Sequence, residues 1–247
     1  MKRKEFLRGL GLMGISSLAI PIINSCSKDD DSGSSTGSDS SSGSGSSSSD
    51  CSVTPSETAG PFPTITPSSL VKSNITMDRT GVAFTIKITI KNTNASCAAL
   101  KSAIVDIWHC DKDGYYSEYG GTSMQSVNYT SVHFLRGRQT TDENGLVTFT
   151  SIFPGWYSGR ATHIHVHIYN AGGTSLLVTQ IAFPEGSNSA VALVNASTAN
   201  GYTKGLTGYT YNASDNVFSD SAAKEMSTIT GCVSEGFVLT HTINVAG

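Results

Sequence analysis

The sequence carries few charges and no surplus of positive charge. Its 247 residues include 16 lysines and arginines against 19 aspartates and glutamates, and charged residues make up only 14% of the chain. Proteins that bind nucleic acid usually carry a basic patch that neutralises phosphates. The sequence has no basic stripe of this kind, so we do not expect a nucleic-acid partner.

Cysteine is scarce too, and the arrangement of the five cysteines disfavours two kinds of site. They include no Cys-x-x-Cys pair, which argues against a zinc site built on such pairs. None of them stands in a motif that activates a nucleophilic thiol. The sequence also has no internal repeat of roughly 20–50 residues, so a solenoid is not expected.

Long segments with the 3.6-residue apolar period of a helix are missing, and alternation of apolar with polar residues takes their place. Residues 185–230 are polar and are expected to form loops, with one short helix near residues 221–226. This pattern predicts an all-β fold, an antiparallel β-sandwich with long loops that carry the functional site. The expected strands span residues 84–91, 103–109, 134–140, 146–152, 163–169, 176–183 and 237–245.

The segment Asp142-Glu143-Asn144-Gly145 separates two of these strands. An Asn-Gly pair accepts the positive φ angles that a tight turn requires. We therefore expect residues 134–140 and 146–152 to form a β-hairpin.

The first residues of the chain resemble an export signal. Residues 1–25 combine a basic start with an apolar run, Leu10 to Ile23, which is shorter than the roughly 20 residues of a membrane-spanning helix. Ile23-Asn24-Ser25-Cys26 resembles a bacterial lipobox, which implies cleavage before Cys26 and attachment to the membrane through the lipidated Cys26. An ordinary secretory signal that is cleaved nearby is the alternative.

Residues 26–50 consist mainly of Ser, Gly and Asp. They contain too few apolar residues to bury a core, so they are predicted to be a flexible tether. Ser27 to Asp31 resembles the acidic sorting signal of surface lipoproteins, which implies an outer-membrane anchor and exposure on the cell surface. Residues 51–247 are then expected to form the one folded domain.

Four cysteines remain besides Cys26. An even number of cysteines in an exported protein favours disulfide bonds. Three pairings are possible, and the sequence does not distinguish them. The four residues are Cys51, Cys97, Cys110 and Cys232.

The stretch from Pro154 to Tyr169 holds the main candidate for a functional site. Its three histidines, at alternate positions from His163 to His167, share one face of the expected strand, and the apolar residue after each of them faces the core. Same-face residues lie roughly 6.5 Å apart, so two imidazoles can bind one metal ion at about 2.0–2.1 Å. Tyr157 and Arg160 directly precede the strand and fit a hard metal ion with an anionic substrate. The alternative is a structural strand without a metal.

Further tyrosines and histidines could complete such a site. Three tyrosines follow the strand 103–109, and each taken alone is expected on the surface: Tyr115, Tyr116 and Tyr119. We expect His167 to pack near the metal rather than to bind it. Three other histidines are expected to be structural residues of strands: His109, His133 and His241.

A set of motifs, in order along the chain, resembles the intradiol ring-cleavage dioxygenases, the family of catechol 1,2-dioxygenase and protocatechuate 3,4-dioxygenase. The resemblance runs from Thr58 to the last strand and is closest to the exported, single-domain members. The motifs are Thr58-Ala59-Gly60-Pro61-Phe62, residues 104–111, Gly114-Tyr115-Tyr116-Ser117, Phe134-Leu135-Arg136-Gly137, Thr141-Asp142, Pro154-Gly155-Trp156-Tyr157, Arg160 and His163-Ile164-His165.

The resemblance implies one ferric ion per chain and cleavage of catechol-type aromatic diols with O2, between the two hydroxyls, to muconate-type products. Arg160 and Gln180 match residues of the family's active site, and Tyr157 matches the ligand that the substrate displaces. A tether stands where the cytoplasmic catechol enzymes have a dimerising helical segment, so the oligomeric state is not predicted. The catechol derivative depends on loop side chains near Tyr116 and in residues 185–220, and the sequence does not predict it. The family's four iron ligands match Tyr116, Tyr157, His163 and His165.

Two other interpretations differ from this one in what they require. A cupin-like metal site built on His-x-His needs a carboxylate a few residues later, and none follows His165 before Glu185. A surface-exposed binding lipoprotein could keep the sandwich and lack activity. Iron binding distinguishes it from an enzyme.

Overall fold

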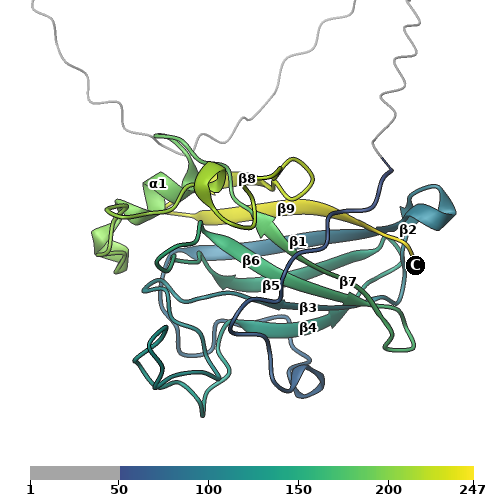
Figure 1. Ribbon diagram of the computed structural model, residues 1–247, viewed down its shortest axis with the longest axis horizontal. Helices are drawn as coiled ribbons and strands as arrows, with labels where there is room; N and C mark the ends of the chain where they lie inside the picture. The colour runs from purple at the N-terminus through teal and green to yellow at the C-terminus, as the bar shows by residue number, and fades with distance from the viewer. Residues whose placement is uncertain (1–50) are drawn as a thin grey trace, which may run out of the picture. The chain divides into compact units, whose positions relative to one another are not determined.

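The computed structural model describes residues 51–247, and the signal peptide, Cys26 and the tether predicted for residues 1–50 lie outside the described residues. The described residues form two β-sheets (Figure 1). One sheet has the strand order β4-β3-β6-β7, and the other has the order β2-β1-β9-β8 with β5 paired to β1. The prediction of an all-β sandwich is confirmed. Its strands are β1 Ala83–Asn92, β2 Ala98–Ala99, β3 Ile104–Trp108, β4 Arg136–Thr140, β5 Leu146–Ile152, β6 His163–Tyr169, β7 Ser175–Ala182, β8 Thr228–Cys232 and β9 Gly236–Val245.

Helical structure is limited to one short α-helix, α1 Ala190–Asn195, and isolated 3-10 turns within the described part of the chain. None of the helices in residues 51–247 is long and apolar enough to cross a membrane. The 3-10 turns span Pro67–Ser69, Thr93–Ala95, Thr198–Asn200 and Asn212–Ser214.

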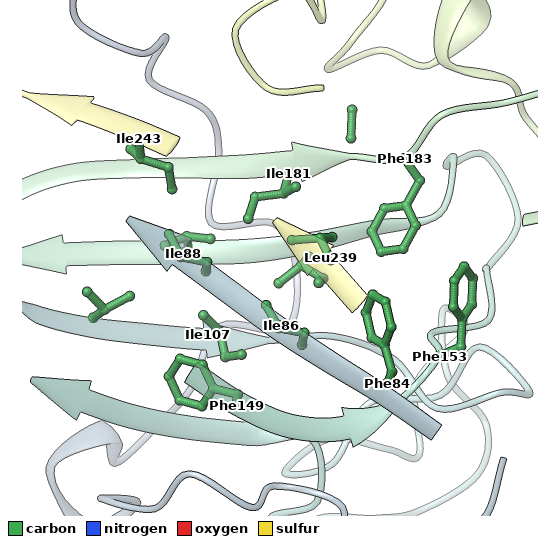
Figure 2. Close-up of a cluster of buried hydrophobic side chains, with 14 of the residues drawn as sticks. Phe84, Ile86, Ile88, Ile107, Phe149, Phe153, Ile181, Phe183, Leu239 and Ile243 are labelled. Atoms are coloured by element: carbon green, nitrogen blue, oxygen red, sulfur yellow. The ribbon is translucent and has the colours of Figure 1, made fainter. Parts of the chain in front are cut away.

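The core lies between the two sheets and contains the apolar residues of the alternating strands. Ile86 and Ile88 of β1 are fully buried, and so are Ile107 of β3 and Ile181 of β7 in the other sheet. Figure 2 shows these side chains together with aromatic rings such as Phe84 in one cluster. The opposite face of the β4-β3-β6-β7 sheet, which carries the histidines of β6, is therefore turned away from the core and toward the loops.

One strand pair departs from the expected antiparallel arrangement. β1 and β9 pair in parallel, with Phe84 opposite Phe237 and Ile90 opposite Ile243. A parallel pair needs a long crossover rather than a tight turn, and most of the domain's sequence separates these two strands. Apolar alternation reports which face of a strand is buried, but it carries no information on the direction of its partner.

The predicted hairpin at Asp142–Gly145 is wrong, although the turn itself forms. Gly145 has a φ angle of 71°, and its N–H donates to the Asp142 carbonyl at 3.0 Å. However, β4 pairs with β3, whereas β5 pairs with β1 in the other sheet. The turn therefore connects the two layers of the sandwich. Its local geometry reverses the chain direction, but it does not determine which strands pair.

The segment between β7 and β8 differs from the sequence prediction in its helix. Residues 221–225 form turns and Met226 forms a β-bridge with Ala182, so the helix is instead α1, whose N-cap Ser189 accepts a hydrogen bond from the Ala192 N–H at 3.2 Å. Val191 and Val194 of α1 are buried at the three-residue spacing of a helix. Two strands, β2 and β8, were not predicted; the burial pattern shows no fully buried residue in either of them.

The cysteines are only partly paired. Cys51 and Cys97 form a disulfide, with their Cα atoms 5.7 Å apart. Cys110 is a free thiol that is buried beneath the candidate site, so the expectation that all four cysteines pair is wrong for this residue. Its apolar surroundings, which include Trp108 and Tyr116, explain the burial because an unpaired cysteine packs as a small apolar side chain.

Two histidines outside the main cluster have defined structural roles. His133 precedes β4 rather than lying in a strand, and its Nδ1 lies 2.7 Å from the carboxylate of the buried Glu118. His109 follows β3 directly; its Nδ1–H donates to the Cys110 carbonyl and its Nε2 accepts from the Ser151 hydroxyl, both at 2.8 Å. His109 is thus held as a neutral imidazole.

The neutral state of His109 predicts a pH-dependent stability. Burial lowers the pKa of His109 from 6.5 to about 4. A lowered pKa means that its contribution is complete above pH 6.5 and is lost as the pH falls toward 4. The free energy of unfolding should therefore drop by about 2 kcal/mol between pH 7 and pH 5 on account of this group.

Urea unfolding of the wild type and of His109→Gln at these two pH values measures that contribution. The drop should be smaller by about 2 kcal/mol in the variant. The other buried histidines titrate in both proteins and cancel in the comparison. Equal drops would show that His109 does not control the pH dependence.

Candidate metal centre

Strand register brings the site residues into one row across the outer face of the β4-β3-β6-β7 sheet. Trp108 at the end of β3 lies opposite Arg136 of β4 on one side and opposite His165 of β6 on the other. His165 in turn lies opposite Gln180 of β7. Directly opposite residues of antiparallel strands project to the same side, so the row places a histidine between an indole and an amide.

The two histidines of β6 direct their Nε2 atoms toward each other. His163 and His165 are 2% and 1% exposed, and their Nε2 atoms are 3.1 Å apart. His163 Nδ1 lies 2.6 Å from the Ala161 carbonyl, so Nδ1 carries the proton and Nε2 presents a lone pair. His165 stacks on Trp108, with ring planes 3° apart and centroids separated by 5.0 Å. Both imidazoles are therefore fixed in orientation before any ligand binds.

Tyr116 completes the contact with His163 from the loop after β3. Its side chain is fully buried, and its hydroxyl donates to His163 Nε2 at 3.3 Å. The buried Gln125 clamps the backbone of Tyr116: its Oε1 accepts from the Tyr116 N–H and its Nε2 donates to the Tyr116 carbonyl, both at 2.7 Å. The expectation that a lone tyrosine here lies on the surface is wrong for Tyr116, because this clamp turns the loop inward.

Tyr157 lies on the open side of the cluster, on the loop before β6. Its ring centroid is 5.8 Å from that of Tyr116 and 5.7 Å from that of His163. Burial raises its pKa, while the positive charge of Arg160 acts in the opposite direction. Arg160 Nη1 lies 3.5 Å from the Tyr157 hydroxyl, and it is the nearest cation to this phenol in the described contacts.

Arg160 is held by a carboxylate and an amide. Its Nε donates to the two carboxylate oxygens of Asp215 at 3.1 and 2.9 Å, and its Nη2 donates to Gln180 Oε1 at 2.6 Å. Gln180 is fixed in turn, since its Nε2 donates to the Thr58 carbonyl at 2.8 Å. The structure thus brings together the six residues that the sequence placed in the site: Tyr116, Tyr157, Arg160, His163, His165 and Gln180.

The segment before the first strand covers the cluster. Gly60 has a φ angle of 68° and packs on His165, where a Cβ atom would lie 2.9 Å from Cε1 of the ring. Phe62 stacks on Tyr116 at 4.9 Å between centroids and meets the edge of Tyr157 at 6.2 Å. The cluster is therefore covered on this side by aromatic rings and backbone, which lowers the local dielectric there.

The donor atoms fit a ferric ion. Two imidazole nitrogens that bind one metal at about 2.0–2.1 Å and near a right angle are roughly 3 Å apart, as the Nε2 atoms of His163 and His165 are. Burial raises the pKa of the Tyr116 phenol well above its ordinary value, and a trivalent cation would supply the charge that a buried phenolate lacks. Phenolate oxygen is a hard donor that suits such an ion.

Protonation of the histidines agrees with this fit. Burial lowers the pKa of His163 to about 3 and that of His165 well below 6.5, so both are neutral ligands at physiological pH. His165 Nδ1 is buried and makes no hydrogen bond with the described residues, although the backbone of Thr58 acts to raise the pKa of His165. Metal at Nε2 would place the proton on Nδ1, toward that backbone.

Other ligand types are not arranged around this point. Among residues 51–247, no group of three or more His, Cys, Asp and Glu residues is placed to hold a metal ion. Burial raises the pKa of the nearby Cys110 thiol, so it is protonated. His167 turns away from the pair: its Nε2 bonds the Ser175 hydroxyl at 2.8 Å and its Nδ1 accepts from Tyr169 at 2.9 Å. The two tyrosines therefore provide the remaining donors of the cluster.

Sequence reasoning missed three residues that position the site. Asp215 comes from the loop between β7 and β8, Gln125 from the loop after β3, and Arg136 from β4. The fully buried Arg136 donates to the Phe62 and Ser117 carbonyls at 2.9 and 2.6 Å, which ties the covering segment to the Tyr116 loop. A resemblance motif contains Arg136, but no local pattern marks the other two.

Comparison with known proteins agrees with the residues in the site. A family model described as "Dioxygenase" matches residues 65–223, more than half of the chain. Chlorocatechol 1,2-dioxygenase from Rhodococcus opacus is 30% identical over 109 residues, which cover 36% of this chain and 40% of that enzyme. The match to this curated relative thus spans less than half of its length.

Solved structures extend the similarity to the whole domain. An intradiol ring-cleavage dioxygenase from Tetranychus urticae is 29% identical with a TM-score of 0.68, over 79% of this chain and 95% of that one. The dioxygenase domain of a carbohydrate-binding fusion from Streptomyces sp. SirexAA-E is 22% identical with a TM-score of 0.55, over 78% and 97%, and shows a shared fold. With a family model that covers most of its folded domain, this chain belongs to the intradiol ring-cleavage dioxygenase family.

Proposed function

We propose that this protein is an Fe(III)-dependent intradiol dioxygenase that opens the ring of catechol-type diols with O2 to give muconate-type products. The observation that carries the proposal is the convergence of the Tyr116 hydroxyl and the Nε2 atoms of His163 and His165 on one buried point, with Tyr157 on its open side. The name of the Rhodococcus relative supports a catechol as the substrate class.

In this proposal Tyr116, Tyr157, His163 and His165 hold the iron. When bound, a ferric ion supplies a Lewis acid and one-electron chemistry that activate the diol toward O2. Tyr116 and the histidines are buried and stay in place. Tyr157 is the more exposed tyrosine, so its side chain would be the one to move aside for the substrate, and its phenolate oxygen would take up one of the substrate's hydroxyl protons.

Arg160 then faces the bound diol with a fixed positive charge. Loss of its hydroxyl protons leaves the diol with a negative charge that its ring shares, and a preorganised cation stabilises this charge without reorganisation. Gln180 binds the guanidinium at Nη2, and the apolar cluster that contains Phe62 and Trp108 keeps water away from the ring of the substrate. These residues bind and orient the substrate, while the proton moves at Tyr157 Oη.

We also propose that the protein is an exported lipoprotein anchored in the outer membrane through Cys26 and exposed on the cell surface. Support comes from the N-terminal signal in the sequence and from the Cys51–Cys97 disulfide, because such bonds persist in oxidising compartments. Radiolabelled fatty acid incorporated by the wild type but not by Cys26→Ala would support the anchor. Release of an unlabelled, soluble protein would contradict it.

A visible absorption spectrum of the purified, iron-loaded protein tests the enzymatic proposal. A broad charge-transfer band from tyrosinate to Fe(III) is expected, and catechol added under air should shift the band and then yield muconate absorbance in the ultraviolet. A protein that stays colourless with iron would contradict the ferric site. The interpretation as a binding protein with the same sandwich would then replace the proposal.

A further inference from the structure

We propose that Asp215 is a positioning residue for the ring-opening reaction: it holds the guanidinium of Arg160 against the substrate site. This inference rests on the proposed function. It assigns a role to the long loop between β7 and β8, which reaches the site through Asp215.

The Asp215 carboxylate binds residues just before β6 and one residue of its own loop. Its carboxylate accepts from Arg160 Nε at 3.1 and 2.9 Å and from the Ala161 N–H at 2.6 Å, and it also accepts from the Val217 N–H of its own loop at 2.8 Å. Asp215 is fully buried and Arg160 is 7% exposed. A buried carboxylate that accepts from three separate donors has one orientation, so it fixes the guanidinium that it binds.

The three nitrogens of Arg160 have different partners. Nε is bound to Asp215, Nη2 is bound to Gln180, and Nη1 is the nitrogen that faces the Tyr157 hydroxyl at 3.5 Å. Removal of the Asp215 carboxylate would free the Nε edge and leave the guanidinium with the short hydrogen bond to Gln180 and the packing of the Phe218 ring. The guanidinium could then rotate away from the position where Tyr157 gives way to substrate.

The rest of the loop supports this placement through contacts that, apart from the Phe218 ring 5.8 Å from the guanidinium carbon, do not involve Arg160. The Tyr209 hydroxyl accepts from the Thr162 N–H at 2.9 Å and donates to the Glu185 carboxylate at 3.1 Å. Trp156 Nε1 donates to the Gly205 carbonyl at 2.9 Å. The loop is thus anchored by contacts other than those of Asp215, so removal of one carboxylate should change Arg160 rather than unfold the loop.

A double-mutant cycle on the iron-loaded protein tests whether Asp215 acts through Arg160. The variants are Asp215→Asn, Arg160→Gln and the double variant, and kcat and KM for catechol are measured for each. Asp215→Asn should lower kcat by about 100-fold, as expected for misplacement by about 1 Å, and change KM much less. In the Arg160→Gln background the same substitution should change kcat by less than about 3-fold, because its target is gone.

Two further measurements separate positioning from a structural role. Iron content and the tyrosinate charge-transfer band should stay at wild-type values in Asp215→Asn. The control is Asp220→Asn in the same loop, an exposed residue that accepts from the Ser221 N–H, and it should leave kcat and the band unchanged. If Asp215→Asn fails to keep the wild-type Tm, Asp215→Glu, which retains the charge, replaces it in the cycle.

Each outcome decides between the two proposals. Turnover by the wild type is measured first, and a wild type with no turnover of catechol overturns the proposed function together with this inference. An active wild type whose two substitutions are additive in kcat overturns the inference alone. Loss of iron from Asp215→Asn also overturns it, because Asp215 would then support the metal ligands rather than Arg160.

Discussion

Replacement of His163 or His165 by alanine should abolish iron retention, whereas His167→Ala should keep it. The first two residues are buried, and their Nε2 atoms are 3.1 Å apart beside Tyr116. His167 is on the same strand two residues later, yet its ring nitrogens bond Ser175 and Tyr169. His167 is therefore a matched control for His163 and His165, because it lies on the same strand but its imidazole points away from theirs.

The expected loss of iron affinity follows from the role of each histidine as a ligand or as a supporting residue. Loss of a residue that only supports a metal ligand typically costs about 10–100-fold in affinity or activity, so loss of a ligand itself should exceed about 100-fold. Iron content per chain, measured after extensive dialysis, reports the loss of iron affinity. The turnover of catechol reports the loss of activity. His167→Ala should retain iron and most of its turnover.

Stability measurements keep this result from being confused with unfolding. Alanine at a buried histidine leaves a cavity, and urea unfolding of the iron-free proteins measures that cost separately. Loss of iron in all three variants would contradict the assignment of His167 as a packing residue. Retention of iron in His163→Ala or His165→Ala would contradict the metal centre itself.

The sequence was most informative in strands where the apolar alternation also places metal-binding side chains on one face. β6 and β5 begin and end as predicted, at His163–Tyr169 and Leu146–Ile152. Alternation determines which side chains of β6 enter the core, so the shared face of His163 and His165 follows from the sequence alone. The stiffness of the strand then limits how far apart two same-face imidazoles can be.

The sequence did not predict which strands pair with one another, because pairing depends on chain segments that are distant in sequence. The turn at Gly145 looked like a hairpin, but it carries the chain from one sheet to the other. The parallel pair β1 and β9 is joined by most of the domain. Loop residues such as Gln125 and Asp215 enter the site only through this long-range arrangement, so no local pattern could place them there.

Tyr116→Phe should separate the function of the site from the stability of the fold. The substitution removes only the hydroxyl, whose contact in the described residues is a long one, 3.3 Å from His163 Nε2. The ring keeps its stacking on Phe62 and the backbone keeps its clamp from Gln125. Iron affinity should therefore fall by more than about 100-fold, while the iron-free protein should unfold at the same urea concentration or a higher one.

Tyr119→Phe is the matched control on the same loop. The Tyr119 hydroxyl donates to the Pro63 carbonyl at 2.6 Å, so its loss should cost about 1 kcal/mol of unfolding free energy. This tyrosine also packs on Phe62, with centroids 5.2 Å apart, but it has no contact with the histidine pair among the described interactions. Its variant should keep both iron and the charge-transfer band.

The two tyrosine variants are thus expected to show opposite effects. Tyr116→Phe would lose iron and keep stability, because a buried phenol with one weak hydrogen bond is poorly satisfied without a metal. Tyr119→Phe would lose stability and keep iron. If Tyr116→Phe retains iron with an unaltered visible band, Tyr116 is not a ligand. The metal would then be held by His163, His165 and Tyr157.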